Sequence, residues 1–166
     1  LALAAVGSRL ATSEASARWL DVILDSMADA VFVTGTDGSI RRVNAAAAGL
    51  TGWPADELDK MNLAALVAEQ DRGAFDVAAA SAGMRELTFT TRSGQTIPVS
   101  LSGSRMAGED PQLRGCVFVA HDITDRKRAE RRIRYLARYD ALTKVPNRMQ
   151  FQHSLQQAIA RARRKG

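Results

Sequence analysis

The sequence is poor in cysteine and has no long apolar segment. Its one cysteine, Cys116, excludes an internal disulfide and a thiolate metal cluster. A single cysteine suits a reducing compartment such as the cytoplasm. No segment approaches the roughly 20 apolar residues that span a bilayer, and the apolar start at residues 1–7 is too short. We therefore expect a cytoplasmic protein, or the cytoplasmic part of a membrane-anchored one.

The sequence also lacks the residue combinations of an enzyme. Nothing in its 166 residues pairs a nucleophile with a base or groups the ligands of a metal ion. We therefore expect no catalytic site within this chain.

Charge is distributed unevenly along the chain. Residues 1–124 hold 10 Lys or Arg and 15 Asp or Glu, whereas residues 125–166 hold 13 Lys or Arg and 3 Asp or Glu. Such a shift indicates a boundary between structural units, which we place near Thr124. With 46% hydrophobic residues, the chain can bury the core of one ordinary domain and carry appendages.

Periodicity predicts the elements before residue 84. A β-hairpin over residues 30–43 turns at Asp37-Gly38, because an Asp-Gly step tolerates a positive φ. Asn44 should cap a short helix, since its side-chain oxygen can accept from the free amides that follow. The expected helices are residues 8–29, 45–48 (broken by 49–54), 54–58 and 69–82, the last ended by Gly83.

Three strands and a long basic helix follow. The strands are expected at residues 84–91, 95–106 and 113–120. The first two alternate apolar and polar side chains, as strands with one buried face do. The third is continuously apolar, which is typical of a central strand.

This order of elements, with the residues at its joints, resembles the PAS domain family. The matching segments are Gly35–Asn44, Leu50–Leu58, Arg92–Gln95 and His121–Lys127, the last with an Asp-Ile-Thr signature. The resemblance implies an α+β fold, with a five-stranded antiparallel sheet flanked by short helices. It also implies a sensory domain at residues 20–124, after a helical linker at residues 1–19.

The family senses through a cavity between the sheet and its short helices. The resemblance therefore implies that apolar residues around this space line a pocket, or simply pack as a core. The candidates are Val31, Val33, Val43, Ala47, Trp53, Leu58, Met61, Leu66, Phe75, Leu87, Phe89, Val99, Leu101, Val117 and Val119. Alanines at 45–48 and 78–80 leave room for a modest cavity. Nothing polar among the candidates identifies a ligand.

The sequence leaves the cofactor unknown. Haem in this family is held by a histidine on the long helix, and residues 69–82 contain none. His121 is expected to be a hydrogen-bonded structural residue. A photochemical flavin needs a cysteine in an Asn-Cys-Arg-Phe setting, whereas Cys116 lies in the last strand. Haem is therefore disfavoured. A non-covalent flavin, stacked on Trp53, remains open beside the ordinary role of Trp53 in the core.

A second resemblance lies near the end of the chain. Residues 140–148 are similar to the turn that opens GGDEF (diguanylate cyclase) domains, with Lys144 and Val145 where Gly and Leu are more usual. The metal-binding aspartates and the GGDEF motif that bind and cyclise GTP do not occur in this chain and would lie beyond it. The resemblance implies that the parent protein makes cyclic-di-GMP. In this family an EAL phosphodiesterase domain often follows. Residues 139–166 would begin the GGDEF domain, and its first helix, 151–164, would bury Phe151, Leu155, Ala158, Ile159 and Ala162.

A signalling helix is expected at residues 125–138, between the PAS-like region and the GGDEF-like region. Ala129, Ile133 and Leu136 recur at steps of four and three, a narrow seam that fits a two-stranded coiled coil. We therefore expect a homodimer. The alternative is a basic helix that binds nucleic acid, but within this helix no aromatic residue precedes Tyr135, and no DNA-binding motif follows. No nucleic-acid partner is expected.

The junction Asp122, Ile123 and Thr124 is the expected signal relay. In a purely structural role, Thr124 would cap the output helix and Asp122 would pair with a basic residue such as Arg92. In a functional role, the junction would transmit strain from sheet to helix. The leading hypothesis is a sensor that binds a small ligand or partner and controls a cyclase through paired helices. A ligand-free dimerisation scaffold is the alternative.

Overall fold

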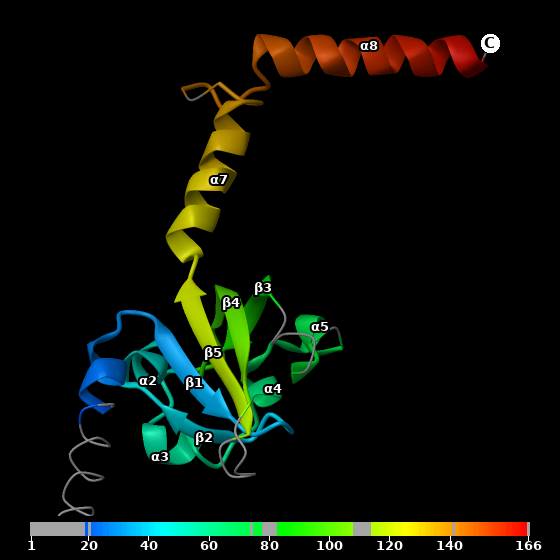
Figure 1. Cartoon of the computed structure of the whole chain (residues 1–166). Helices are drawn as coiled ribbons and strands as arrows, with labels where there is room; N and C mark the ends of the chain where they lie inside the picture. Colours follow the sequence, from blue (N-terminus) through cyan, green and yellow to red (C-terminus); the bar gives the residue numbers. More distant parts are fainter. Residues whose placement is uncertain are drawn as a thin grey trace, which may run out of the picture. The chain divides into compact units, whose positions relative to one another are not determined.

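The structure is a computed structural model. The chain divides between Ile123 and Thr124 into two units. The first unit holds a β-sheet with short helices, and the second holds two helices joined by a turn (Figure 1). The described residues are 19, 21–73, 75–77, 83–107, 114–140 and 142–165.

The first unit is built on a five-stranded antiparallel sheet with the order β2-β1-β5-β4-β3 (Figure 1). Its strands are β1 Ala30–Thr34, β2 Ile40–Val43, β3 Met84–Thr90, β4 Thr96–Met106 and β5 Gly115–Asp122. All pairings in this sheet are antiparallel, which confirms the predicted architecture. β5 lies between β1 and β4, as its continuous apolar run indicates. It ends two residues later than predicted, at Asp122, while residue 113 lies outside the described part.

The hairpin between β1 and β2 turns at the predicted Asp-Gly step. Gly38 has a φ of 82°, which residues with a Cβ rarely adopt. The Asp37 carboxylate accepts hydrogen bonds from the hydroxyl (2.6 Å) and the amide (3.1 Å) of Ser39. Because these bonds favour the ionised form, they hold the pKa of Asp37 below its ordinary value of 3.8.

Short helices follow the hairpin and precede β3. They are α2 Ala45–Thr51, α3 Ala55–Leu58, α4 Leu63–Leu66 and α5 Glu69–Arg72. The predicted break of the first helix at Gly49 is wrong. The helix continues to Gly52, which has a φ of 72° and whose N–H donates to the Ala48 carbonyl (2.9 Å). The left-handed end of a helix favours glycine, and Gly52 rather than Gly49 takes that position.

Sequence periodicity did not reveal α4. Its start is set by Asn62, whose side-chain oxygen accepts from the Ala64 amide (3.0 Å) while its amide group donates to the Asp37 carbonyl (2.8 Å). The signal for this helix in the sequence was an asparagine directly before an apolar run, because asparagine often caps the start of a helix. Four residues are too few for a helical period to show.

The single helix predicted over residues 69–82 is also wrong in its first part. α5 ends at Arg72, with Gly73 as its C-cap, and residues 75 and 76 are not helical. Glycine inside a helix costs about 1 kcal/mol relative to alanine, which favours an end there. Residues 74 and 78–82 lie outside the described part of the chain.

The described part of the predicted helix 8–29 is helical at residues 19 and 21–26, and residues 1–18 and 20 lie outside the description. The Asp25 carboxylate accepts from the Ala45 amide (3.0 Å), and Asp21 forms an ion pair with Arg42. These contacts join the segment to the start of α2 and to β2. The helix ends before residue 27, earlier than predicted.

The core lies on one face of the sheet, against the short helices. A single buried cluster forms there. It consists of alternate residues of the strands, which point to the same face of the sheet, and of apolar residues from the short helices and their ends. Its members are Ala30, Phe32, Ile40, Ala47, Leu58, Leu63, Leu66, Val67, Phe89, Val99, Leu101, Cys116, Phe118 and Ala120.

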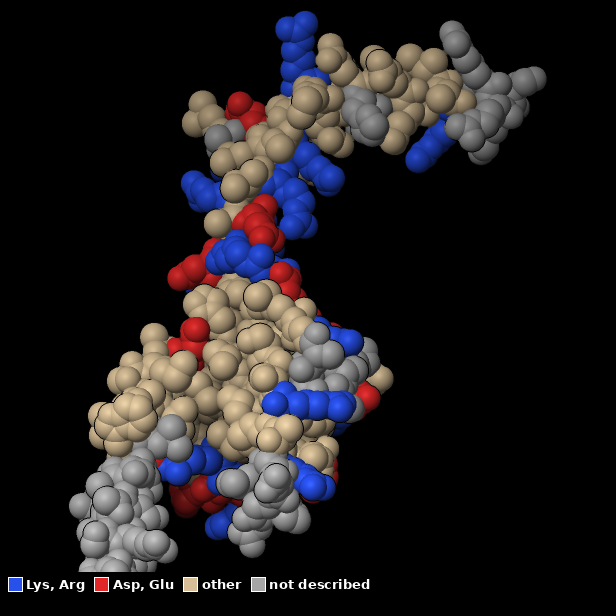
Figure 2. All heavy atoms as spheres, viewed as in Figure 1, with Lys and Arg blue, Asp and Glu red and all other residues tan. Residues whose placement is uncertain are grey.

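The second unit consists of α7 Thr124–Leu136, α8 Arg148–Lys165 and the turn between them. Lys and Arg side chains lie along α7 on the face seen in Figure 2, in agreement with the basic composition of this region. α7 ends two residues before the predicted residue 138, and α8 begins three residues before the predicted residue 151.

Candidate functional site

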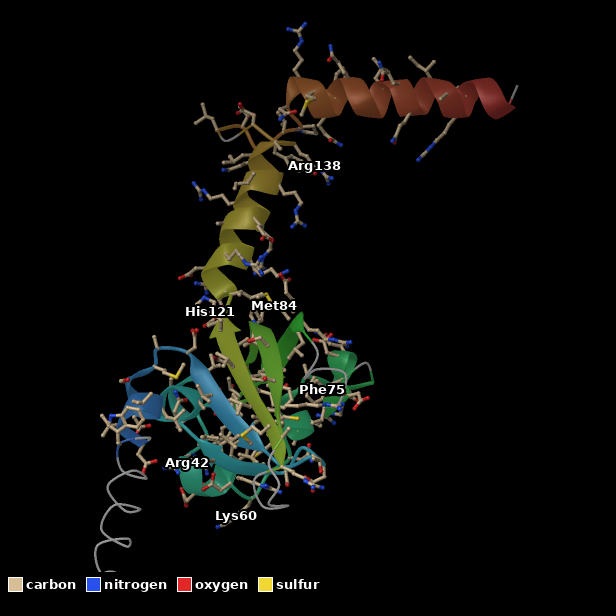
Figure 3. All side chains as sticks on the ribbon, viewed as in Figure 1. Arg42, Lys60, Phe75, Met84, His121 and Arg138 are labelled. Carbon is tan, nitrogen blue, oxygen red and sulfur yellow. The ribbon has the colours of Figure 1, made fainter. Side chains whose placement is uncertain are left out.

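The structure brings most of the predicted pocket wall together. Six candidates lie within the buried cluster: Ala47, Leu58, Leu66, Phe89, Val99 and Leu101. Five more are partly buried and pack against it: Val43, Trp53, Met61, Phe75 and Leu87. Phe75 lies on the side of the sheet that carries the helices (Figure 3). These eleven residues therefore share the space between the sheet and the helices.

The other four candidates, Val31, Val33, Val117 and Val119, do not belong to this wall. Val31 pairs with Val119 and Val33 pairs with Val117 across β1 and β5. Their sequence neighbours, such as Phe32, are the residues in the core cluster. Because side chains alternate along a strand, the four valines face the opposite side of the sheet.

The core residues that the sequence analysis missed lie mostly at the alternate positions of the same strands. They are Ala30, Phe32, Ile40, Leu63, Val67, Cys116, Phe118 and Ala120. A continuously apolar strand shows no alternation of apolar and polar residues, so its sequence does not reveal which alternate residues face the core. The Phe32 and Phe89 rings meet edge to face with centroids 6.0 Å apart, so this pair joins β1 to β3 within the buried cluster.

Asn44 organises the polar side of this region. Its side-chain oxygen accepts from the Val31 amide (2.9 Å) and the Ala47 amide (3.0 Å). Its amide nitrogen donates to the carbonyls of Leu24 and Asp29, both at 2.9 Å. The predicted helix cap is confirmed, and the same side chain also joins the 21–26 helix, β1 and α2. A buried amide that uses both of its ends in this way fixes the relative position of the elements it joins.

Trp53 is partly buried, and the guanidinium of Arg92 lies over its ring, 5.3 Å from the centroid. Arg92 also forms an ion pair with Glu57 at 3.0 Å, and its amide donates to the Thr51 carbonyl at 3.0 Å. A flavin that stacked on this face of Trp53 would have to displace Arg92. Arg92 therefore pairs with Glu57 and not with Asp122, the partner that the sequence suggested.

The largest cavity that we describe lies apart from the predicted wall. It has a volume of about 530 Å³ and is lined by residues at the ends of β4 and β5 that flank their connection, with Thr36 and Val77. None of the fifteen predicted pocket residues lines it. The part of the chain that the structure describes contains no group of three or more His, Cys, Asp or Glu residues that could hold a metal ion.

Comparison with known families agrees with this architecture. A sequence model described as the PAS fold matches residues 24–128, more than half of the chain. The chain belongs to this family. A search of curated proteins finds no match.

Solved PAS domains share the fold at low sequence identity. A PAS domain of a two-component sensor histidine kinase is 18% identical with a TM-score of 0.58, over 66% of this chain and 98% of that one. A PAS domain from Colwellia psychrerythraea is 20% identical with a TM-score of 0.59, over 65% and 97%. One from an HTR-like protein of Haloarcula marismortui is 18% identical with a TM-score of 0.55, over 70% and 99%. These likenesses concern the fold.

The end of the PAS domain is anchored at the predicted relay. Ile123 is buried, with 4% of its surface exposed, and its amide donates to the Pro98 carbonyl (3.0 Å). His121, at the end of β5 (Figure 3), approaches the Asp29 carboxylate at 2.6 Å through Nδ1. This confirms the expected hydrogen-bonded histidine. Thr124 is the first residue of α7 and makes further contacts there, and its role as a cap stays a prediction.

The predicted seam on α7 is exposed in the second unit. Ala129 is exposed, and 68% of Ile133 and 44% of Leu136 are accessible. The seam is therefore a narrow apolar stripe on a helix that is otherwise basic.

No helix within the described residues is long and apolar enough to cross a membrane.

The turn between α7 and α8 is fixed by two side chains. The Asp140 carboxylate accepts from the amides of Leu142 (3.1 Å) and Thr143 (2.8 Å), and from the Thr143 hydroxyl (2.9 Å). The Thr143 hydrogen bonds are the main cause that lowers the pKa of Asp140 below 3.8. Asn147 caps α8 by accepting from the Gln150 amide (2.9 Å) and donates to the Ala137 carbonyl (2.9 Å).

Lys144 is unusual within this turn. Its φ is 61°, the one positive φ of a non-glycine residue in the described chain. The left-handed conformation costs roughly 1–2 kcal/mol for most residues and little for glycine. The position where GGDEF openings usually carry glycine is therefore the position that needs glycine's backbone freedom.

Proposed function

We propose that this PAS domain is the sensory part of a dimeric signalling protein that controls a GGDEF-type diguanylate cyclase through α7. The left-handed backbone at Lys144 carries the proposal. It gives a physical reason for the glycine that is usual there. The residues that hold the turn, Asp140, Thr143 and Asn147, are those that the resemblance shares.

The apolar side of α8 supports the same proposal. Phe151, Leu155 and Ile159 stand at steps of four and are 61%, 49% and 47% exposed. Such a stripe is the buried face of a helix in a larger domain. The remainder of a GGDEF domain is the partner we propose for it. In that family an EAL domain often follows.

The signal would leave the sheet at Asp122–Thr124. Ile123 is packed into the core and hydrogen-bonded to Pro98 in β4, and the next residue begins α7. A change in sheet curvature would therefore act on the first turn of α7. Two copies paired along Ala129, Ile133 and Leu136 would pass that change to two cyclase domains, which act across a dimer.

The rest of the proposal concerns partners and compartment. The input is a small ligand or a protein partner, and the cofactor stays unknown, with haem disfavoured and non-covalent flavin open. We propose a cytoplasmic location, which suits the buried free thiol of Cys116. No nucleic-acid partner is proposed. The chain itself, without the GGDEF motif, is proposed to be inactive as a cyclase.

Cyclic-di-GMP synthesis by the full-length parent protein tests this function. The parent should convert GTP to cyclic-di-GMP with magnesium, and residues 1–166 alone should not. In the parent, Ile123→Asp should change the cyclase rate, because a charge would enter the buried anchor. Arg131→Gln, a mild change on an exposed side of α7 away from Ala129, Ile133 and Leu136, serves as the control. A parent protein that binds no GTP and makes no product would contradict the proposal.

A ligand-free dimerisation scaffold is the second candidate. The edge-to-face contact of Phe32 with Phe89 favours it, because these rings lie within the buried cluster that holds much of the predicted pocket wall. Native mass spectrometry of the purified chain separates the two. A mass equal to twice the chain with no added ligand supports the scaffold, whereas a co-purified molecule supports the sensor.

A further inference from the structure

The 530 Å³ cavity is within the usual size range of small-molecule sites, about 300–1,000 Å³. It lies beside the ends of β4 and β5 that flank their connection. Its apolar lining comes from Val77, Met106, Ala107 and Cys116, and its charged lining from Arg105 and Arg114. An apolar wall with a few charged groups is the composition of a ligand site rather than of a solvent groove.

Positive charge gathers at this cavity. Arg105 stands opposite Cys116 in the pairing of β4 with β5, and Arg114 precedes β5. A third guanidinium, that of Arg41, donates to the Arg114 carbonyl (3.1 Å). These arginines also make other contacts, and their guanidinium groups add positive charge beside the cavity. The Asp37 carboxylate in the neighbouring turn accepts a hydrogen bond from Ser39 and is also stabilised by the charge of Arg41.

A buried hydroxyl lies next to the cavity wall. Thr34 is fully buried and pairs in register with Cys116, which lines the cavity. Its Oγ1 is the one buried side-chain oxygen or nitrogen that lacks a hydrogen-bond partner within the described structure. Buried polar atoms are nearly always paired, and an exception needs an explanation. Thr34 is not among the residues that line the cavity, so this hydroxyl lies behind the wall and does not contact a bound molecule.

We propose that this cavity binds a small organic acid, with its carboxylate at Arg105 and Arg114 and its apolar body against Met106 and Cys116. Guanidinium groups match carboxylates because they donate two parallel hydrogen bonds. The apolar wall distinguishes an organic acid from an inorganic anion. That this molecule is the sensory input rests on the proposed function, whereas its binding does not.

The experiment uses residues 1–166 and benzoate as the probe, with benzamide as its neutral isostere. Amide shifts in NMR spectra locate the site and give the affinity. Benzoate should shift the amides of Thr36, Met106 and Cys116 and bind at least tenfold more tightly than benzamide. Inorganic phosphate should bind at least tenfold more weakly than benzoate, because it leaves the apolar wall wet.

Three variants accompany the titration. Arg105→Gln together with Arg114→Gln should weaken benzoate at least tenfold and leave benzamide unchanged. Arg85→Gln, an exposed arginine of β3 that does not line the cavity, should leave benzoate binding unchanged. Ala107→Trp, at an exposed lining position, should block both probes without unfolding the domain.

Other results overturn the proposal. Equal binding of benzoate and benzamide would remove the role of the arginines. Shifts confined to residues away from the cavity would move the site, and phosphate binding as tight as benzoate would make it a simple anion site. None of these outcomes bears on cyclase control, because the proposed function is tested by cyclic-di-GMP synthesis in the parent protein.

Discussion

Replacing Asn44 with alanine should destabilise the PAS domain far more than an ordinary loss of a helix cap. The side chain is 2% exposed and makes four hydrogen bonds of 2.9–3.0 Å. Loss of the cap alone costs about 1 kcal/mol. Each of the other three bonds is worth about 1 kcal/mol, and a buried group left unpaired costs about 1–3 kcal/mol. We therefore expect a loss of roughly 3 kcal/mol or more in the free energy of unfolding, because the Val31 amide is left buried without a partner.

Asn62→Ala is the matched control. Asn62 also caps a short helix, but it makes two hydrogen bonds, one partly buried and one exposed. Its loss should cost about 1 kcal/mol. The assay is urea unfolding followed by circular dichroism, with a thermal melt beside it. For a domain of about 100 residues, 1 kcal/mol shifts Tm by about 4–8 °C, so Asn44→Ala should lower Tm by more than 10 °C.

A third variant tests which end of the side chain matters. Asn44→Asp keeps the acceptor oxygen for the Ala47 amide but removes the N–H donors and places a carboxylate beside the carbonyls of Leu24 and Asp29. It should therefore destabilise nearly as much as Asn44→Ala. If Asn44→Ala and Asn62→Ala shift the urea midpoint equally, the reasoning from four simultaneous bonds is refuted.

Three further predictions concern the seam, the turn and the hairpin. Ile133→Asp with Leu136→Asp should convert a dimer to a monomer by light scattering, at a cost of several kcal/mol, because charges would be buried between helices; Arg131→Asp on another side of α7 should not. Lys144→Asn should slow amide hydrogen exchange in the turn, since asparagine tolerates a positive φ, and faster exchange would contradict the assigned strain. Because its pKa is lowered, ionised Asp37 stabilises the folded state at pH values above the ordinary pKa of 3.8. This contribution is lost as the pH falls through the lower pKa of the folded state. Asp37→Asn should therefore lose less stability than wild type between pH 6 and pH 3, and equal losses in urea unfolding would count against it.

Much of the fold could be predicted because the decisive signals are local. The Asp37-Gly38 step gave the hairpin, and Asn44 gave the start of α2. α4 escaped prediction because a four-residue helix shows no period. The break assigned to Gly49 was wrong because two glycines stand near the end of that helix, and only one can take the left-handed end position.

The candidate site was predicted less completely, and the reason is geometric. Eleven of the fifteen wall residues lie around the interior, but Val31 and Val119 were assigned to it in place of their neighbours in the core, such as Phe32 and Phe118. In a strand that is apolar on both faces, composition cannot show which face is which. The charged cavity was missed because Arg105 and Arg114 are nine residues apart and look like surface arginines in the sequence.

The sequence by itself determined the order of the elements, the local caps and turns, and the change of character near Thr124. Each of these depends on residues within a few positions of one another, where propensity and hydrogen-bonding geometry act directly. Only the tertiary structure decided which side of β1 and β5 is buried, which carboxylate Arg92 pairs with, and where the cavity lies. These depend on register and on contacts between distant segments, and a shift of one residue in register would reverse every side chain in a strand.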